Sequence, residues 1–290
     1  MPETQSSPQI RFVTTADGTE LATRTVGEPL RGTVLLVMGA TASMVWWPDS
    51  MVRALSQSGF RVICFDHRDT GQSTTNPPGE VRYDIMDLAS DLIAILDAHD
   101  VESAHLVGMS LGGYLAQIAA LTHPQRVKSL TLVASEPLGI DYAGAGLAPA
   151  FMDHFASMAE LDWTNHDAVA RFLLRIAELS AGSALPFDTD AALARIETEL
   201  ARTQSMQSAF NHSMLAGQLD AGLDAGKLDL PVLLIHGTED PIIAVAAAEA
   251  SAAATRDAQV LLFAGRGHEL LQTDIPSITD AIVALTKRDR

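Results

Sequence analysis

The chain begins with alternating hydrophobic and polar residues and then changes to short, nearly continuous hydrophobic runs. The alternation over Ile10–Thr15 and Glu20–Val26 surrounds an Asp17-Gly18 turn, which predicts an antiparallel hairpin at the edge of a sheet. The continuous runs are typical of strands covered on both faces, and they comprise Val34–Met38, Val62–Phe65, Ala104–Val107, Leu130–Ala134, Pro231–His236 and Ala258–Phe263.

Amphipathic segments separate these runs. Over Tyr83–Ala98, hydrophobic residues recur at helical spacing with aspartates on the opposite side, and helices are also predicted over Tyr114–Leu121, Val245–Ala254 and Ile275–Lys287. Strands that alternate with helices imply right-handed βαβ units. The two hairpin strands and six runs therefore predict an α/β fold with a mostly parallel eight-stranded sheet and helices on both faces.

The alternation stops between Gly139 and about Gly226, where the chain is rich in alanine and helical in pattern. A chain of 290 residues suits one large domain with an insertion, because a single core stops growing near roughly 250 to 300 residues. We predict a first part of the core over 1–138, an inserted helical cap over 139–228 and the second part of the core over 229–290.

The composition narrows the class of protein. Hydrophobic residues make up 47% of the chain, and 36 acidic against 19 basic residues give a formal charge of -17. Such a charge repels nucleic-acid phosphates and anionic membrane surfaces, so we expect neither as a partner. Met1–Ile10 has neither a basic start nor an apolar run, and Cys64 is the only cysteine. We expect a soluble, unprocessed cytoplasmic protein with no disulfide and no thiolate metal cage.

A G-x-S-x-G motif follows the predicted strand Ala104–Val107. Residues 108–113 read Gly-Met-Ser-Leu-Gly-Gly and lead into the predicted helix Tyr114–Leu121, which is the strand-turn-helix setting of a nucleophile elbow. The helix N-terminus directs free N–H groups at an oxyanion formed there. A serine before a helix is also a common N-cap, but the glycines and the preceding strand favour Ser110 as a nucleophile.

A nucleophilic serine needs an imidazole that accepts its proton. Among nine histidines, His268 lies in a turn directly after the last predicted strand, at the edge where parallel sheets bind ligands. His105 and His236 fall within strands, which favours hydrogen-bonded core residues. We therefore predict His268 as the general base.

The imidazole in turn needs a carboxylate that orients it. In the elbow arrangement this acid lies between the serine and the histidine in the sequence. Glu239 and Asp240 follow the predicted strand Pro231–His236, and Glu136 follows Leu130–Ala134. We prefer Asp240 and keep Glu239 and Glu136 as alternatives.

Two backbone amides are candidates for the oxyanion hole. One is the N–H of Leu111, directly after the nucleophile, and the other belongs to the loop after the third strand. That loop contains Met38-Gly39-Ala40-Thr41, so we predict the N–H of Ala40 as the second donor.

Apolar and aromatic residues near these positions suggest a small-molecule cleft. Trp46 and Trp47 follow the oxyanion loop, Met109 precedes the nucleophile and His212 lies in the predicted cap. We take these four as candidate substrate contacts, with core packing as the alternative for the tryptophans.

The segment Phe65–Thr74, with Val37–Ala40 and Trp47–Asp49, resembles the aclacinomycin methylesterase family within the α/β-hydrolase superfamily. The wider resemblance to that superfamily runs from about Thr19 to Thr286. Many members have histidine where Met38 stands and glycine where Asp69 stands, so the chain fits a subset. The resemblance implies a polyketide-like methyl ester as substrate, a triad of Ser110, Asp240 and His268, and oxyanion donors at Ala40 and Leu111.

The segment Asp66–Ser73 has no nucleophile with an evident base. We expect Arg68 and Asp69 to tie this loop through hydrogen bonds, with substrate contact by His67 or Arg68 as the alternative.

These residues together predict a serine hydrolase that cleaves a small-molecule carboxylic ester through an acyl-enzyme, without a cofactor or metal. The same triad also serves lactone opening, carbon–carbon bond hydrolysis and perhydrolysis. A ligand receptor with idle catalytic residues is a third hypothesis. The presence of all three triad residue types in the expected order argues against the receptor.

Overall fold

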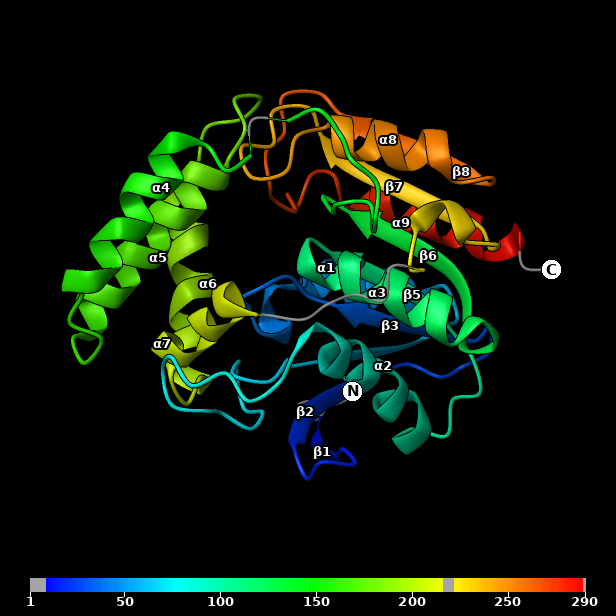
Figure 1. The fold of residues 1–290 in the computed structure, drawn as a ribbon, viewed down its shortest axis with the longest axis horizontal. Helices are drawn as coiled ribbons and strands as arrows, with labels where there is room; N and C mark the ends of the chain where they lie inside the picture. The colour runs from blue at the N-terminus through cyan, green and yellow to red at the C-terminus, as the bar shows by residue number, and fades with distance from the viewer. Residues whose placement is uncertain (1–8, 145, 216–221, 289–290) are drawn as a thin grey trace, which may run out of the picture.

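A computed structural model describes residues 9–144, 146–215 and 222–288. Its centre is an eight-stranded sheet in the order β1-β2-β4-β3-β5-β6-β7-β8 (Figure 1). Strand β2 pairs antiparallel with β1 and β4, and all other neighbours are parallel. The strands are β1 (Ile10–Thr14), β2 (Glu20–Val26), β3 (Thr33–Val37), β4 (Arg61–Phe65), β5 (Ala104–Met109), β6 (Val127–Val133), β7 (Val232–Gly237) and β8 (Ala258–Phe263).

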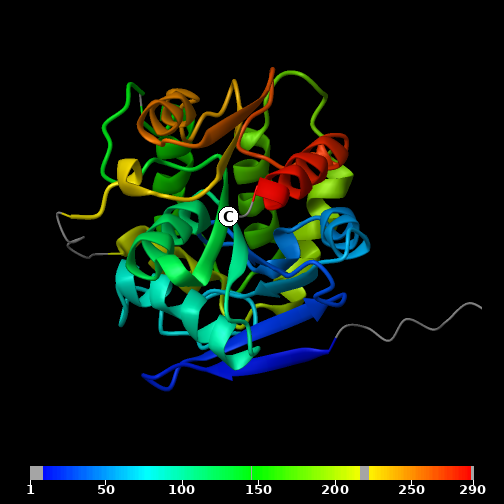
Figure 2. The same cartoon turned by 90° about the vertical axis from the view of Figure 1, so that its right-hand side faces the viewer.

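The predicted edge hairpin and the mostly parallel sheet are confirmed. Figure 2 shows the hairpin of β1 and β2 at one end of the twisted sheet and β8 at the other. The inner strand β3 is buried along its whole length. The expectation that β8 is covered on both faces is wrong, because Val260 and Leu262 are 45% and 42% exposed. The strand β8 forms the second edge of the sheet. Its hydrophobic run resembles that of an inner strand, so the sequence does not indicate the edge position.

Helices cover both faces of the sheet, as predicted. The helices α2 (Ile85–Ala98), α3 (Leu111–Thr122) and α8 (Ala246–Ala254) contribute to one hydrophobic cluster with the sheet. The helices α1 (Asp49–Gln57) and α9 (Ile275–Leu285) contribute to another cluster on the opposite face. Each face of the inner strands is thereby removed from water, which is the main favourable term in folding.

The helix α2 begins at Ile85, two residues later than the hydrophobic pattern predicts. The Asp84 carboxylate accepts hydrogen bonds from the N–H groups of Met86 and Asp87, and the Asp87 carboxylate accepts one from the Asp84 N–H. This reciprocal capping box satisfies amides that have no partner within the helix. Tyr83 instead belongs to the preceding loop.

Helices fill the chain between β6 and β7, and the described residues there contain no strand of the sheet. Figure 1 shows this group, called the cap helices below, stacked together beside the sheet. Around Phe172 and Ile196 they bury a small hydrophobic cluster of their own. The division at 139 and 228 stays a prediction. The cap helices are α4 (Pro149–Ala156), α5 (His166–Ser180), α6 (Thr189–Arg202) and α7 (Met206–Ala209), followed by the 3₁₀ turn η4 (Phe210–Met214).

Two further features bear on the expected location. In the ranges that the structure describes, no helix has both the length and the apolar character needed to cross a membrane. Residues 1–8, whose polarity enters the location prediction, lie outside the described ranges. Cys64 on β4 is fully buried, and burial raises the pKa of its thiol to about 11.

The capping box of α2 generates a stability prediction. Replacing Asp84 by alanine removes the acceptor for two amides and should lower the free energy of unfolding by about 1 kcal/mol. Urea denaturation followed by circular dichroism measures this change. Asp153→Ala, at an exposed position inside α4, is the matched control and should leave the stability unchanged or slightly raised. Equal effects of the two substitutions would contradict the assignment of the cap.

Candidate active site

The predicted catalytic residues follow strands that end at the same edge of the sheet. Ser110 comes directly after β5, Asp240 comes after β7 and His268 comes after β8. The strands β5, β6, β7 and β8 are consecutive parallel neighbours. Because parallel strands place their carboxyl ends together, the fold brings these three residues to one edge.

Ser110 has a backbone conformation that few non-glycine residues adopt. Its φ is 51° and its ψ is -120°, between the last residue of β5 and the first residue of α3. Although Ser110 occupies the N-cap position, its side chain makes no capping hydrogen bond. A strained, positive-φ serine at a strand-to-helix turn is the geometry of a nucleophile elbow.

Glycines allow the chain to close tightly around this serine. A Cβ atom on Gly112 would collide with the carbonyl oxygen of Val37, so the start of α3 can approach the end of β3 only with glycine there. A Cβ on Gly39 would lie 3.3 Å from the Cβ of Ser110. The loop after β3, residues Met38–Ser43 and called the β3 loop below, therefore lies against the Ser110 side chain.

The two amides predicted for the oxyanion hole flank Ser110. Leu111 is the first residue of α3, where helical amides have no partner within the helix. Ala40 is an exposed residue of the β3 loop. Within the described ranges, neither amide donates a hydrogen bond to another residue, so both are available to an acceptor from outside.

Asp240 and His268 are joined by a short hydrogen bond. The Nδ1 of His268 donates to the Oδ2 of Asp240 at 2.7 Å, and the Asp240 side chain is fully buried. The other oxygen, Oδ1, accepts the N–H groups of Ile242 and Ile243, each at 2.9 Å. Burial alone would raise the pKa of Asp240, but the hydrogen bond and charge of His268 and the two amides lower it overall.

The alternatives to Asp240 make other contacts. Glu239 accepts hydrogen bonds from the amide and hydroxyl of Ser183, both at 2.9 Å. Glu136 accepts a hydrogen bond from the hydroxyl of Tyr142. In the described part of the chain, Asp240 is the carboxylate that contacts His268.

The prediction that His105 and His236 are hydrogen-bonded core residues is confirmed. His105 is hydrogen-bonded to the hydroxyl of Ser129 at 2.8 Å, and His236 donates from Nε2 to the carbonyl of Ile243 at 2.8 Å. The Nε2 of His236 also lies 3.5 Å from the Oδ2 of Asp240. His236 thus supports the turn that holds the carboxylate.

The end of α5 binds the loop that carries His268. The His268 N–H donates to the carbonyl of Ser180 at 2.8 Å, and the Gly182 N–H donates to the Glu269 carboxylate at 3.1 Å. The Ala184 N–H donates to the carbonyl of Gly265 at 2.9 Å. The chain at the end of α5 therefore holds the loop that carries His268, residues 265–269 and called the histidine loop below, in place through these hydrogen bonds.

The predicted structural role of Arg68 and Asp69 is confirmed. Arg68 forms a bidentate ion pair with Asp91, with N–O distances of 2.8 and 2.7 Å. Asp69 accepts hydrogen bonds from the Tyr83 hydroxyl at 2.7 Å and the Asn211 amide at 2.9 Å. Both side chains are buried, and their polar groups are bound by these protein partners. This arrangement disfavours substrate contact by Arg68.

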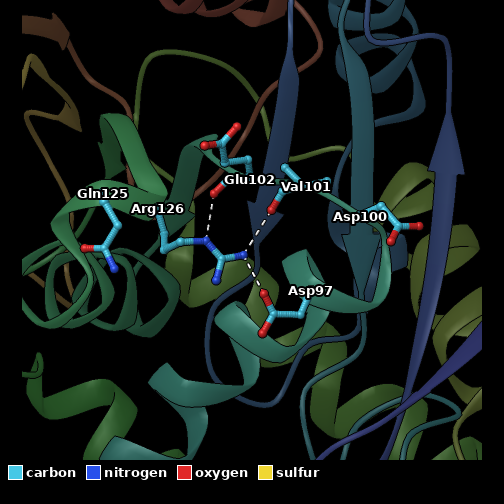
Figure 3. Close-up of a pocket in the computed structure, with 6 residues that line it drawn as sticks. All are labelled: Asp97, Asp100, Val101, Glu102, Gln125 and Arg126. Carbon is cyan, nitrogen blue, oxygen red and sulfur yellow. Dashed lines mark hydrogen bonds and ion pairs between the residues drawn. The ribbon is translucent and has the colours of Figure 1, made fainter.

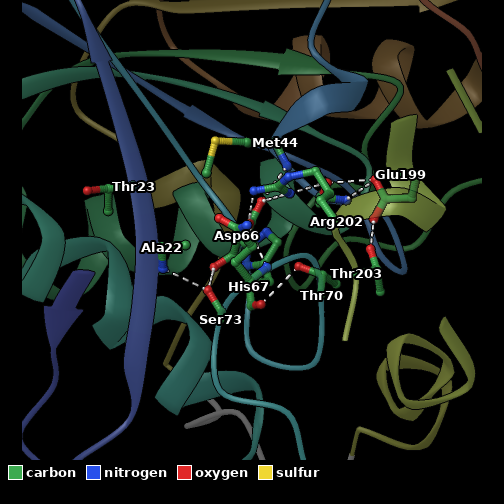
Figure 4. Close-up of polar contacts among 12 residues, drawn as sticks. Ala22, Thr23, Met44, Asp66, His67, Thr70, Ser73, Glu199, Arg202 and Thr203 are labelled. Atoms are coloured by element: carbon green, nitrogen blue, oxygen red, sulfur yellow. Dashed lines mark hydrogen bonds and ion pairs between the residues drawn. The ribbon is translucent and has the colours of Figure 1, made fainter. Parts of the chain in front are cut away.

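A second network joins the cap helices to the core and is not apparent from the sequence. Figure 4 shows Arg202, at the end of α6, facing the carboxylate of Asp66; the two N–O distances are 2.9 and 2.7 Å. Glu199, one helical turn earlier, accepts hydrogen bonds from the amide and hydroxyl of Ser43. The signal that could indicate this contact is the position of Glu199 three residues after Ile196, on the buried side of α6.

The four candidate substrate contacts have different environments. Trp47 is 1% exposed and packs in the core with α1 and α9, so the alternative of core packing holds for this residue. Trp46 is partly exposed and packs against the cap cluster, and Met109 is partly exposed beside Ser110. His212 is 5% exposed, and both of its ring nitrogens are hydrogen-bonded to backbone groups. Trp46 and Met109 retain surface that a ligand can contact.

A surface hollow of about 390 Å³ lies near the amino ends of β5 and β6 (Figure 3). Arg126 lies within it, but its guanidinium is bound by Asp97 and by the carbonyls of Val101 and Glu102. The residues that line the hollow come directly before β5 and β6 in the sequence. The hollow therefore lies at the opposite ends of these strands from Ser110 and His268. We therefore assign it no part in the candidate site.

Comparisons with known proteins define the family. A model of the α/β hydrolase fold family matches residues 32–274, and the chain therefore belongs to that family. It is 29% identical over 289 residues to a rhodomycin D methylesterase of Streptomyces sp. strain C5, covering 94% of this chain and 97% of the relative. It is 28% identical over 285 residues to a non-heme chloroperoxidase of Streptomyces lividans, covering 95% and 99%. An esterase structure from Exiguobacterium antarcticum superposes with a TM-score of 0.76 at 18% identity, covering 96% and 100%.

His67 is a buried neutral residue beneath the β3 loop. Its Nε2 donates to the carbonyl of Met38 at 2.8 Å. Burial lowers the pKa of His67 to about 3, with a smaller contribution from the neighbouring His212. The unfolded chain therefore binds a proton to this histidine at pH values where the folded chain does not.

This difference predicts a loss of stability in acid. Because the pKa of folded His67 lies below its ordinary value of 6.5, its stabilising contribution is full above pH 6.5 and is lost progressively as the pH falls toward 3. Between pH 7 and pH 5 the loss should be about 2 kcal/mol. His67→Gln keeps a donor near the position of Nε2 without titrating, so its stability should fall less over this range. Denaturant unfolding at both pH values measures the difference.

The matched control is Met152→Gln, because Met152 is 59% exposed on α4 and has no titratable group. It should reproduce the pH dependence of the unmodified protein. A parallel fall for His67→Gln and the unmodified protein would contradict the buried neutral state of His67.

Proposed function

We propose that the protein hydrolyses a carboxylic ester through an acyl-enzyme on Ser110, with His268 as general base and Asp240 as the orienting carboxylate. The observation that carries the proposal is the 2.7 Å hydrogen bond between His268 and Asp240, at the sheet edge where the strained Ser110 also lies. A histidine whose Nδ1 donates to a buried carboxylate has its Nε2 free to accept the serine proton.

The proposed reaction has two steps. The Oγ of Ser110 attacks the ester carbonyl carbon while the Nε2 of His268 takes its proton, and the amides of Ala40 and Leu111 stabilise the oxyanion. His268 then returns the proton to the leaving alcohol. Water attacks the acyl-enzyme by the same proton path and releases the acid.

We further propose a methyl ester of a polyketide-like aromatic acid as the substrate class. The similarity to a rhodomycin D methylesterase over 94% of this chain supports this choice. Met109 is partly exposed and offers a polarisable thioether, and Trp46 is partly exposed with the Arg195 guanidinium over its ring at 5.4 Å; both side chains are suited to contact with aromatic rings.

Removing the nucleophile tests the chemistry. Ser110→Ala should lower kcat for p-nitrophenyl acetate by at least about 10⁴-fold, and Asp240→Asn should lower it by roughly 10⁴-fold, because the amide no longer fixes the required tautomer. Release of p-nitrophenol measures both. Glu239→Gln, at the neighbouring carboxylate, is the matched control and should retain most of the activity. Undiminished turnover by Ser110→Ala would sink the proposal.

Covalent labelling separates an enzyme from a receptor with idle residues. A fluorophosphonate should form one phosphorus–oxygen bond to Ser110 with loss of fluoride, detectable as a mass shift of that peptide. Folded protein that remains unlabelled would favour the receptor.

Perhydrolysis is the second candidate function. The similarity to a non-heme chloroperoxidase over 95% of this chain favours it above lactone opening and carbon–carbon bond hydrolysis. In this reaction hydrogen peroxide replaces water on the acyl-enzyme and releases a peracid, which then oxidises a halide.

A substrate panel ranks these activities. We expect kcat/KM for the methyl ester of a fused-ring aromatic acid to exceed that for methyl acetate by at least about tenfold, which corresponds to about 1.4 kcal/mol of additional binding. Lactone opening, carbon–carbon bond hydrolysis and peroxide-dependent bromination in acetate buffer complete the panel. If bromination or lactone opening is faster than hydrolysis of every ester, the proposed substrate class is wrong.

A further inference from the structure

The β3 loop is held by side chains from outside it. The carbonyl of Met38 accepts from the Nε2 of His67 at 2.8 Å, and the N–H of Thr41 donates to the Nδ1 of His212 at 3.0 Å. The N–H of Ser43 donates to Glu199 at 3.3 Å. His212 and Glu199 both belong to the segment of helices between β6 and β7, so this segment binds two of the three anchored groups.

His212 has a defined protonation state and orientation. Because its Nδ1 accepts the Thr41 amide, its proton must reside on Nε2, which donates to the carbonyl of Arg68 at 2.9 Å. The ring is 5% exposed, and burial lowers the pKa of His212, which keeps the imidazole neutral. A protonated ring could not accept from Thr41. His212 thus joins the β3 loop to the loop that contains Arg68.

Ala40 lies between two fixed residues and is itself unanchored. Gly39 on one side is buried against Ser110, and Thr41 on the other has a φ of 65°, which the His212 contact helps to maintain. Ala40 is exposed, so packing does not hold it in place. The direction of the Ala40 N–H therefore depends on how its two neighbours are held.

We propose that His212 is a positioning residue that aims the Ala40 amide at the oxyanion, through its hydrogen bond to the amide of Thr41. The inference rests on the proposed function, because it takes Ala40 as an oxyanion donor. It replaces the expectation that His212 contacts the substrate. The helical segment after β6 then contributes to turnover.

Two substitutions at His212 separate its two hydrogen bonds. In His212→Asn the side-chain oxygen lies near the former position of Nδ1, so the acceptor for Thr41 is kept and the donor to Arg68 is lost. In His212→Gln the amide nitrogen lies near the former Nε2, so the donor to Arg68 is kept and the acceptor for Thr41 is lost. The two variants are similar in polarity and neither titrates.

The proposal predicts opposite outcomes for the two variants. His212→Gln should lower kcat for p-nitrophenyl acetate by about 10- to 100-fold, the range expected when one oxyanion donor is misdirected. Its KM should change by less than about twofold, because the amide acts mainly in the transition state. His212→Asn should stay within about threefold of the unmodified kcat. His166→Gln on the surface of α5 is the control for a generic histidine-to-glutamine change.

Fluorophosphonate labelling distinguishes positioning from damage to the fold. His212→Gln should still be labelled completely at Ser110 but more slowly, because its fold and nucleophile are intact. Equal kcat values for the Gln and Asn variants would overturn the proposal. So would an activity loss in His212→Gln that matches the fraction of protein that cannot be labelled, since that loss reports misfolding. Unmodified protein that neither reacts with the fluorophosphonate nor hydrolyses any ester would instead overturn the proposed function itself.

Discussion

The parallel pairing of the six strands β3 to β8 is the constraint on which the rest of the structure depends. It obliges the loops after β3, β5, β7 and β8 to emerge at one edge, although their residues are far apart in the sequence. A shift of one residue in the register of any inner strand would exchange its two faces. Both faces of β3 are buried, so such a shift would require new packing on both sides of the sheet.

Loops gathered at one edge create a second requirement, because their backbone groups have no neighbouring strand with which to pair. Side chains meet this requirement here. Asp66 is fully buried and accepts the amides of Met44 and Gln72 while it pairs with Arg202. A buried ion pair alone gives little net stability, and removing one partner is costly. The additional amide contacts make Asp66 a junction between β4, its own loop and α6.

Local patterns in the sequence predict much of this arrangement. Hydrophobic runs identify the strands, and the glycines around Ser110 identify the elbow. Chain order and placement after strands indicate Asp240 and His268 as the candidate acid and base. In the structure these two side chains are hydrogen-bonded to each other. Such features are predictable because periodicity and tight turns depend on residues close together in the sequence.

Other features depend on contacts that a local pattern cannot contain. His212 and Thr41 are 171 residues apart, so the sequence alone gives no reason to pair them. The hydrophobic run of β8 looks like that of an inner strand, because strand order is decided by the whole sheet. Trp47 and Trp46 are adjacent and chemically identical, yet one packs in the core and the other lies partly exposed against the cap helices.

The attachment of the cap helices has an evolutionary consequence. Their contacts reach the histidine loop at Ser180, the β3 loop at His212 and the end of β4 at Arg202. A group of helices attached in this way is not an exchangeable module. A new cap acquired by recombination would have to bring matching anchors for all three places, so lineages of this protein would be expected to change specificity by substitutions within the existing helices.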